Sequence, residues 1–132
     1  MSQISPAIYS MIAASLLPLL FAVIAKITAG FKPKDNQNPR AFLAQTHGLA
    51  ARANAAQANS YETLPVFLAA VLMAEYMVVS QVVINQLAMF YVILRVLYGV
   101  AYLINWATLR SILWVLGLAC PIMLLLFAAR LS

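Results

Sequence analysis

The chain has 132 residues, of which 65% are hydrophobic and 8% are charged. An average soluble domain carries about 25% charged residues, so this composition excludes a water-soluble globule and indicates a membrane protein with one domain over residues 1–132. The net charge of +5 rests on only eight Lys and Arg residues, and their clustering in one region indicates membrane topology rather than nucleic-acid binding.

Four apolar segments are each close to the roughly 20 residues that an α-helix needs to cross the hydrocarbon core of a bilayer. No basic residue precedes the first segment, so we interpret it as a retained span and not as a signal peptide. We therefore expect an all-α fold, an integral membrane bundle of four helices. The expected spans cover residues 7–29, 61–79, 83–104 and 112–129.

The connections between these spans differ in length and polarity. Residues 30–60 form the one long polar connection, which begins at Gly30 as a loop with two prolines. From Arg40 to Ser60 the chain is rich in Ala, Gln and Leu and has no Pro, which predicts a cytoplasmic extension of the second helix that Gly48 can interrupt. The connection from Ser80 to Val82 is very short, so we expect the second and third helices to be a tight antiparallel pair.

Lys and Arg near the span ends predict the orientation, because cytoplasmic loops carry an excess of these residues. Only Arg130 lies near the side opposite the first and third connections. We therefore expect these connections in the cytoplasm and both termini on the other side. The short loops are compatible with a bacterial inner membrane. The basic residues on the expected cytoplasmic side are Lys26, Lys32, Lys34, Arg40, Arg52 and Arg110.

Two sets of polar side chains lie inside the expected spans, where charges are costly and mark functional sites by default. Asn59 and Glu62 have i, i+3 spacing, and Arg95, Tyr98 and Tyr102 have i, i+3, i+7 spacing, so each set forms one stripe on its helix. At about 1.5 Å per residue the second stripe is about 10 Å long. Because both stripes fall in the same leaflet, we expect a polar cleft for a peptide-sized ligand that opens to the cytoplasm.

Three motifs in register give the chain a resemblance to a known family. They are Asn59-x-x-Glu62, Arg95-x-x-Tyr98-x-x-x-Tyr102 and Arg110-Ser111. Together with the length and span order, they resemble the MAPEG family, the membrane-associated proteins of eicosanoid and glutathione metabolism. The resemblance covers nearly the whole chain and is that of a bacterial-type member similar to the microsomal glutathione transferases.

Membership of that family would imply a homotrimer of four-helix subunits that binds glutathione, as a co-substrate, in a cytoplasm-facing cleft between neighbouring subunits. Glutathione transferases, glutathione peroxidases and eicosanoid-forming synthases belong to it, as does a lipid-binding member without catalysis. The resemblance implies a transferase or peroxidase that acts on hydrophobic electrophiles or lipid hydroperoxides reaching it through membrane lipids.

The resemblance also implies roles for individual residues. Arg110 would lie beside the glutathione sulfur, where a guanidinium favours the thiolate over the thiol. Ser111 would donate a hydrogen bond to that thiolate. Arg95 would be a buried ion-pair partner or ligand clamp. The expected peptide-binding residues are Asn59, Glu62, Tyr98 and Tyr102.

The chain also departs from the family pattern. Ala55 and Gln57 stand where eicosanoid-forming members carry arginine and histidine. Arg52, one turn earlier, is a candidate replacement for the lost cation. Tyr98 stands where some members have histidine, and Trp114 where some have tyrosine. With fewer cationic side chains to hold the ligand, a prostaglandin-type reaction is not expected.

Each motif also has a structural interpretation. Glu62 and Arg95 can be a buried ion pair that only holds helices together, and Arg110 can be a topology anchor. Tyr98 and Tyr102 can be interfacial aromatics. A non-catalytic lipid-binding or scaffold protein with the same fold is therefore an alternative function. A small four-helix multidrug exporter is a further alternative, although its acid would lie in the first span, where this chain has none. No metal site is expected.

Overall fold

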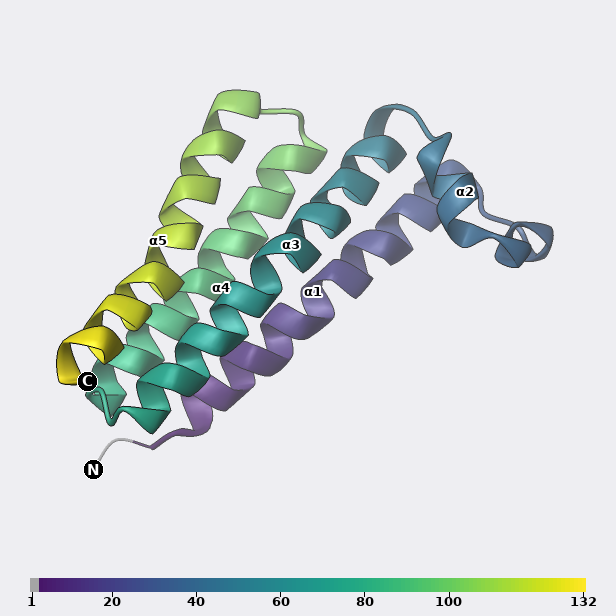
Figure 1. Cartoon of the computed structure of the whole chain (residues 1–132). Helices are drawn as coiled ribbons and strands as arrows, with labels where there is room; N and C mark the ends of the chain where they lie inside the picture. Colours follow the sequence, from purple (N-terminus) through teal and green to yellow (C-terminus); the bar gives the residue numbers. More distant parts are fainter. Residues whose placement is uncertain (1–2) are drawn as a thin grey trace.

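The computed structural model describes residues 3–132, and within them the chain consists of helices and their connections. The long helices form an up-and-down bundle. Both ends of the described chain lie at one end of it, and a hairpin with two short helices, residues 30–47, lies at the other (Figure 1). This confirms the predicted all-α class. The long helices are α1 (Ser5–Ala29), α3 (Gly48–Tyr76), α4 (Gln81–Leu103) and α5 (Ala107–Leu131), and the short ones are η1 (Pro33–Gln37) and α2 (Pro39–Ala44).

Three of the long helices, α1, α4 and α5, are long and apolar enough to cross a membrane. The second expected span, 61–79, overlaps the C-terminal half of α3, which is not one of the three. Because α3 ends at Tyr76, a window long enough to span must reach back past Glu62 into a polar segment. A fourth span in α3 therefore stays a prediction.

The connection between α3 and α4 lies earlier in the chain than predicted. The expected link from Ser80 to Val82 is wrong, because the helix ends at Tyr76 and the next one begins at Gln81. Val78 adopts a φ of 59°, in the left-handed region, and the Val79 amide donates to the Ala74 carbonyl at 3.0 Å. Met77, Val78 and Val79 of this turn are apolar, so composition alone assigned them to the span.

Small side chains let the helices approach one another closely. The buried positions of α3 repeat every three or four residues, which is the spacing of left-handed helix packing. Small residues at such positions are typical of helix contacts in membranes. α3 and α4 both pack against α1 and α5, whereas α1 and α5 do not touch each other within the described residues. The α3 stripe comprises Ala53, Ala56, Ser60, Thr63, Phe67, Ala70 and Ala74.

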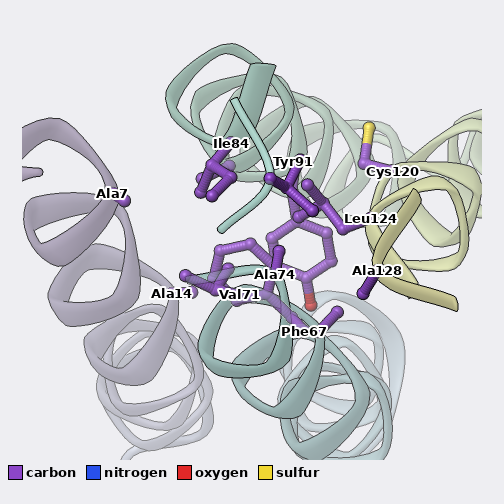
Figure 2. Close-up of a cluster of buried hydrophobic side chains, with 13 residues drawn as sticks. Ala7, Ala14, Phe67, Val71, Ala74, Ile84, Tyr91, Cys120, Leu124 and Ala128 are labelled. Atoms are coloured by element: carbon purple, nitrogen blue, oxygen red, sulfur yellow. The ribbon is translucent and has the colours of Figure 1, made fainter. Parts of the chain in front are cut away.

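A core at the end of the bundle near the chain termini joins all four long helices (Figure 2). The rings of Phe67 and Tyr91 stack with centroids 4.0 Å apart and an interplanar angle of 8°. The Thr63 hydroxyl is within 3.0 Å of the Tyr91 hydroxyl, so the one polar atom of that ring is hydrogen-bonded. Leu124 of α5 is fully buried in the same cluster. This core holds α3 against α4 directly beneath the polar residues described below.

Gly99 is required where α4 crosses α1. A Cβ atom at this position would overlap Cζ of the buried Phe21 ring, so the ring or the helix would have to shift. We predict that Gly99→Ala lowers the free energy of unfolding by about 1–3 kcal/mol through overpacking. Thermal unfolding of the detergent-solubilised protein measures this change.

Gly117→Ala is the matched control for that experiment. Its Cβ would make an ordinary contact of 3.7 Å with Cδ of Arg95. Because alanine is the better helix former, we expect Gly117→Ala to be neutral or stabilising by up to about 1 kcal/mol. Equal losses for the two variants would contradict the assigned crossing.

The outer faces of the bundle are apolar. Of the residues in the most apolar segment of each helix, only 28% in α1 and 33% in α4 and α5 are buried inside the described chain. Large side chains such as Leu20 and Leu116 are about half exposed. Soluble monomers rarely expose contiguous apolar surface on this scale, so these faces are suited to contact lipid or other helices.

The polar connection 30–47 is more structured than a loop. Pro33 and Pro39 each start a short helix, a position at which the missing proline N–H costs nothing. The Asn38 side chain accepts a hydrogen bond from the Ala41 amide at 3.2 Å and caps α2. The helix expected from Arg40 to Ser60 is present as α2 and as α3 from Gly48 onward, with a break over residues 45–47 next to Gly48.

Candidate functional site

Arg95 is the most unusual residue of the bundle, because its charged side chain is only 2% exposed in the middle of α4. Its Nη2 donates to Oδ1 of Asn59 at 2.8 Å and to Oγ of Ser60 at 3.1 Å. The predicted buried pair with Glu62 is wrong, since Glu62 is exposed and Arg95 binds neutral oxygens instead. The buried cation therefore links α4 to α3 through an amide and a hydroxyl.

A stack of two tyrosine rings between two guanidinium groups runs from Arg95 to the end of the bundle. The Arg95 guanidinium lies 4.1 Å from the ring centroid of Tyr98. The Tyr98 and Tyr102 rings meet edge to face with centroids 5.7 Å apart. The Arg110 guanidinium lies 4.5 Å from the centroid of Tyr102. Cation–π contacts of this kind are worth about 0.5–2 kcal/mol each, so the stack orients Arg110 of α5 against the α4 stripe.

A cavity of about 470 Å³ opens beside this stack, between α3, α4 and α5. Its volume falls in the range of small-molecule sites, roughly 300–1,000 Å³. It lies at the end of the bundle where α4 connects to α5. Five residues that the sequence proposed line it together. The cavity is lined by Asn59, Tyr98, Tyr102, Arg110, Ser111, Trp114 and Val115.

Three proposed site residues lie outside the cavity wall. Arg95 lies behind it, in contact with Asn59 and Tyr98. Nε of Arg52 donates to the Leu103 carbonyl at 3.2 Å, so this side chain joins α3 to the last turn of α4. Glu62 is exposed on the outer face of α3. The two motif residues Asn59 and Glu62 therefore point in different directions.

Trp114 and Val115 complete the cavity and were not proposed as site residues from the sequence. They follow Arg110 by four and five positions along α5, so one helical turn separates the cationic part of the wall from its apolar part. Trp114 is 37% exposed, which leaves its ring available to a ligand. The i, i+4 spacing from Arg110 was the available signal, but apolar residues on a membrane helix do not stand out from packing residues.

Ser111 lies next to the cation but is engaged locally. Its hydroxyl donates to the Ala107 carbonyl at 3.2 Å, within the first turn of α5. The side chain is exposed, and a hydroxyl proton can rotate toward a better acceptor. Ser111 can thus donate to an anion in the cavity in exchange for a weak bond to its own helix.

The fold and the site together define an α-helical integral membrane protein with a cationic and aromatic cavity at one end of its bundle. The family model of the MAPEG family matches residues 6–130. The chain belongs to the MAPEG family. No curated protein and no solved structure gave a significant match.

Proposed function

We propose that this chain is a glutathione-dependent transferase or peroxidase that acts on hydrophobic electrophiles or lipid hydroperoxides. The observation that supports it most is the cavity in which Arg110, oriented by Tyr102, lies next to Ser111. MAPEG membership is consistent with glutathione chemistry and argues against the alternative of a multidrug exporter.

The proposed chemistry is electrostatic. A thiol with a pKa of about 8.5 is mostly protonated at neutral pH, and a guanidinium nearby lowers that pKa and raises the thiolate fraction. Arginine stays charged and cannot act as the base, so the proton leaves to solvent through the open end of the cavity. In the transferase reaction the thiolate forms an S–C bond to the electrophile and the leaving group departs with its electron pair. In the peroxidase reaction the thiolate attacks the distal oxygen of the hydroperoxide, the O–O bond breaks, and the alkoxide takes a proton from solvent to become the alcohol. A second glutathione then reduces the resulting sulfenic acid, which gives glutathione disulfide and water.

The peptide part of glutathione has polar partners along the wall. The side-chain oxygen of Asn59 accepts a hydrogen bond from Arg95. The NH₂ group of Asn59 can therefore donate to a ligand carbonyl. Tyr98 and Tyr102 supply hydroxyls at the edge of the stack. The bound peptide would thus lie along the α4 stripe with its sulfur at Arg110.

Glu62 and Arg52 suggest that the site is shared in a homotrimer. Glu62 is exposed on α3, where it can accept a bond from a ligand amino group held at a boundary between subunits. Arg52 joins the ends of α3 and α4 and can present its remaining N–H groups at the same boundary. In this proposal α3 is the fourth span, and its polar half is covered by the neighbouring subunit.

A second candidate function is lipid binding without catalysis. An apolar groove of about 630 Å³ runs between α1 and α3, lined by residues such as Met11, Leu68 and Leu72. A groove of this kind suits an acyl chain and needs no thiol chemistry. Calorimetric titration with glutathione, followed by turnover of a model aryl halide, separates the two functions. Saturable binding with turnover supports the transferase, and absence of both supports the lipid-binding protein.

The proposed orientation has the hairpin and the cavity in the cytoplasm and both termini on the other side of a bacterial inner membrane. Single cysteines at Lys34 and Thr108 should then react with impermeant maleimide only from the cytoplasmic side, and one at Ser132 only from outside. The buried Cys120 is first replaced by alanine to remove background labelling. The reverse pattern would refute the orientation.

A further inference from the structure

The eight basic residues of the chain are strongly segregated in space. Arg95 is buried in the bundle, and Arg130 lies in the last turn of α5 near the termini. All the others lie at the hairpin end. Between Lys26 and Arg52 there is a single acidic residue, Asp35.

That acidic side chain is turned toward the backbone of the hairpin. Oδ2 of Asp35 accepts a hydrogen bond from the Lys32 amide at 2.9 Å and caps the start of η1. The side chains of Lys32, Lys34 and Arg40 are exposed. The outer surface of the hairpin is therefore basic, and its one carboxylate is already used locally.

The hairpin is docked on the bundle. Leu43 of α2 is buried against Ala25 of α1 and Ala53 of α3. The rings of Phe31 and Phe42 meet edge to face with centroids 5.1 Å apart. These contacts hold the basic side chains at the ends of α1 and α3, which is the depth of the lipid headgroups if α1 spans the bilayer.

A hollow with polar residues in its wall and an exposed apolar part of α1 both lie at this end of the bundle. A hollow of about 340 Å³ at the junction of α1, α2 and α3 is lined in part by Gln45, Thr46 and His47. On α1, toward the membrane interior, Val23 and Ile27 are 50% and 74% exposed. A headgroup at the basic hairpin would leave its acyl chains against this apolar face, which a free phosphate cannot use.

We propose that residues 26–47 form a binding site for an anionic phospholipid, with the headgroup held by Lys32, Lys34 and Arg40. Each Lys or Arg near an anionic membrane surface raises binding by roughly fivefold. The three side chains together should therefore give a selectivity for anionic over zwitterionic lipid of at least about tenfold. This site is separate from the proposed glutathione cavity and does not depend on it.

Native mass spectrometry of the full chain, purified in detergent, tests the proposal. The protein is titrated with phosphatidylglycerol or phosphatidylcholine of the same acyl chains, and bound lipid is counted. We expect at least about tenfold tighter retention of phosphatidylglycerol by the wild type. The variant K32Q/K34Q/R40Q should lose this selectivity, because it removes the exposed charges and leaves the buried contacts of Leu43 intact.

Two variants and one competitor make the result specific. K32R/K34R keeps the charge and should keep the selectivity, and Arg130→Gln removes a cation at the opposite end and should leave it unchanged. Inorganic phosphate at millimolar concentration should not displace the lipid. Equal retention of both lipids by the wild type, or full selectivity in K32Q/K34Q/R40Q, would overturn the proposal. Displacement by phosphate would overturn the assignment to a lipid.

Discussion

Replacing Arg110 by leucine is expected to lower turnover of an aryl halide at neutral pH by about tenfold or more, while glutathione still binds. The reason is that a nearby opposite charge shifts a pKa by about one to three units, and loss of the guanidinium returns the bound thiol toward its free value. In the proposed binding mode most polar contacts to the peptide would be made by other residues that line the cavity, such as Asn59 and Tyr98. Steady-state kinetics and calorimetric titration of the same preparation separate the two effects.

The pH dependence of turnover shows whether Arg110 lowers or raises the pKa of the bound thiol. The thiolate predominates above its pKa, so the wild type should retain activity to lower pH, and the profile of Arg110→Leu should move to higher pH. Arg110→Lys should keep part of the activity, because a point charge survives without the planar fork. Ser111→Ala should cost no more than a hydrogen bond to a charged group, roughly 1.5–3 kcal/mol. Unchanged turnover in Arg110→Leu would show that the residue is only a topology anchor.

Tyr102 provides a control on the orientation of Arg110. Because the guanidinium lies 4.5 Å from the Tyr102 ring, Tyr102→Phe should preserve the cation–π contact and most of the low-pH activity. Tyr102→Leu removes the ring and should shift the pH profile as Arg110→Leu does, by a smaller amount. Identical profiles for the two variants would contradict the positioning role.

The second large effect is on stability and concerns Arg95 and Asn59. Asn59→Leu leaves the guanidinium, only 2% exposed, without its shortest hydrogen bond of 2.8 Å. We expect the free energy of unfolding of this variant to fall by about 2–3 kcal/mol, because a buried charged group that loses a hydrogen bond pays a large desolvation cost. Replacing both partners, as in Arg95→Met with Asn59→Leu, should recover part of the loss because no buried charge remains. Thermal unfolding in detergent measures both.

Glu62→Leu is the control for this cycle. Since Glu62 is exposed and does not meet Arg95 within the subunit, its effect should simply add to that of Arg95→Met. Coupling of more than about 0.5 kcal/mol between Glu62 and Arg95 would show that the two interact. Additive losses for Asn59 and Arg95 would contradict the hydrogen bond seen here.

Much of the site was predictable from helical spacing. Arg95, Tyr98 and Tyr102 share one face of α4 because i, i+3 and i+7 positions always do. Arg110 and Ser111 open the next helix, so the short α4–α5 connection brings them to the same end. These features depend only on helix geometry and connection length, and the cavity is lined by Tyr98 and Tyr102 of the first set and by both residues of the second.

The direction of Glu62 was not predictable in the same way. Residues at i and i+3 lie about 60° apart around a helix axis, so rotation of α3 decides which of the two faces Arg95. The buried stripe of small residues fixes that rotation with Ser60 inward, which brings Asn59 toward Arg95 and turns Glu62 outward. A carboxylate seemed the natural partner for arginine, but packing of Ala56 and Thr63 outweighed that preference.

Local backbone geometry accounts for the other differences. Val78 leaves the helix through a left-handed conformation that β-branched residues rarely adopt, so nothing in the sequence marked the end of α3. Pro33 and Pro39 were interpreted as loop residues, although each fits the first turn of a short helix. The composition of the hairpin was thus informative about charge and misleading about structure.

We propose that the cavity beside Arg110 binds glutathione and lowers the pKa of the glutathione thiol. Ultraviolet difference spectroscopy of the protein with saturating glutathione, recorded from acid to alkaline pH, follows the thiolate directly. We predict a thiolate band that is present at neutral pH and titrates at least one unit below the free value of about 8.5, and that this shift is lost in Arg110→Leu. A band that titrates as in free glutathione, in a preparation where calorimetry shows saturation, would contradict it.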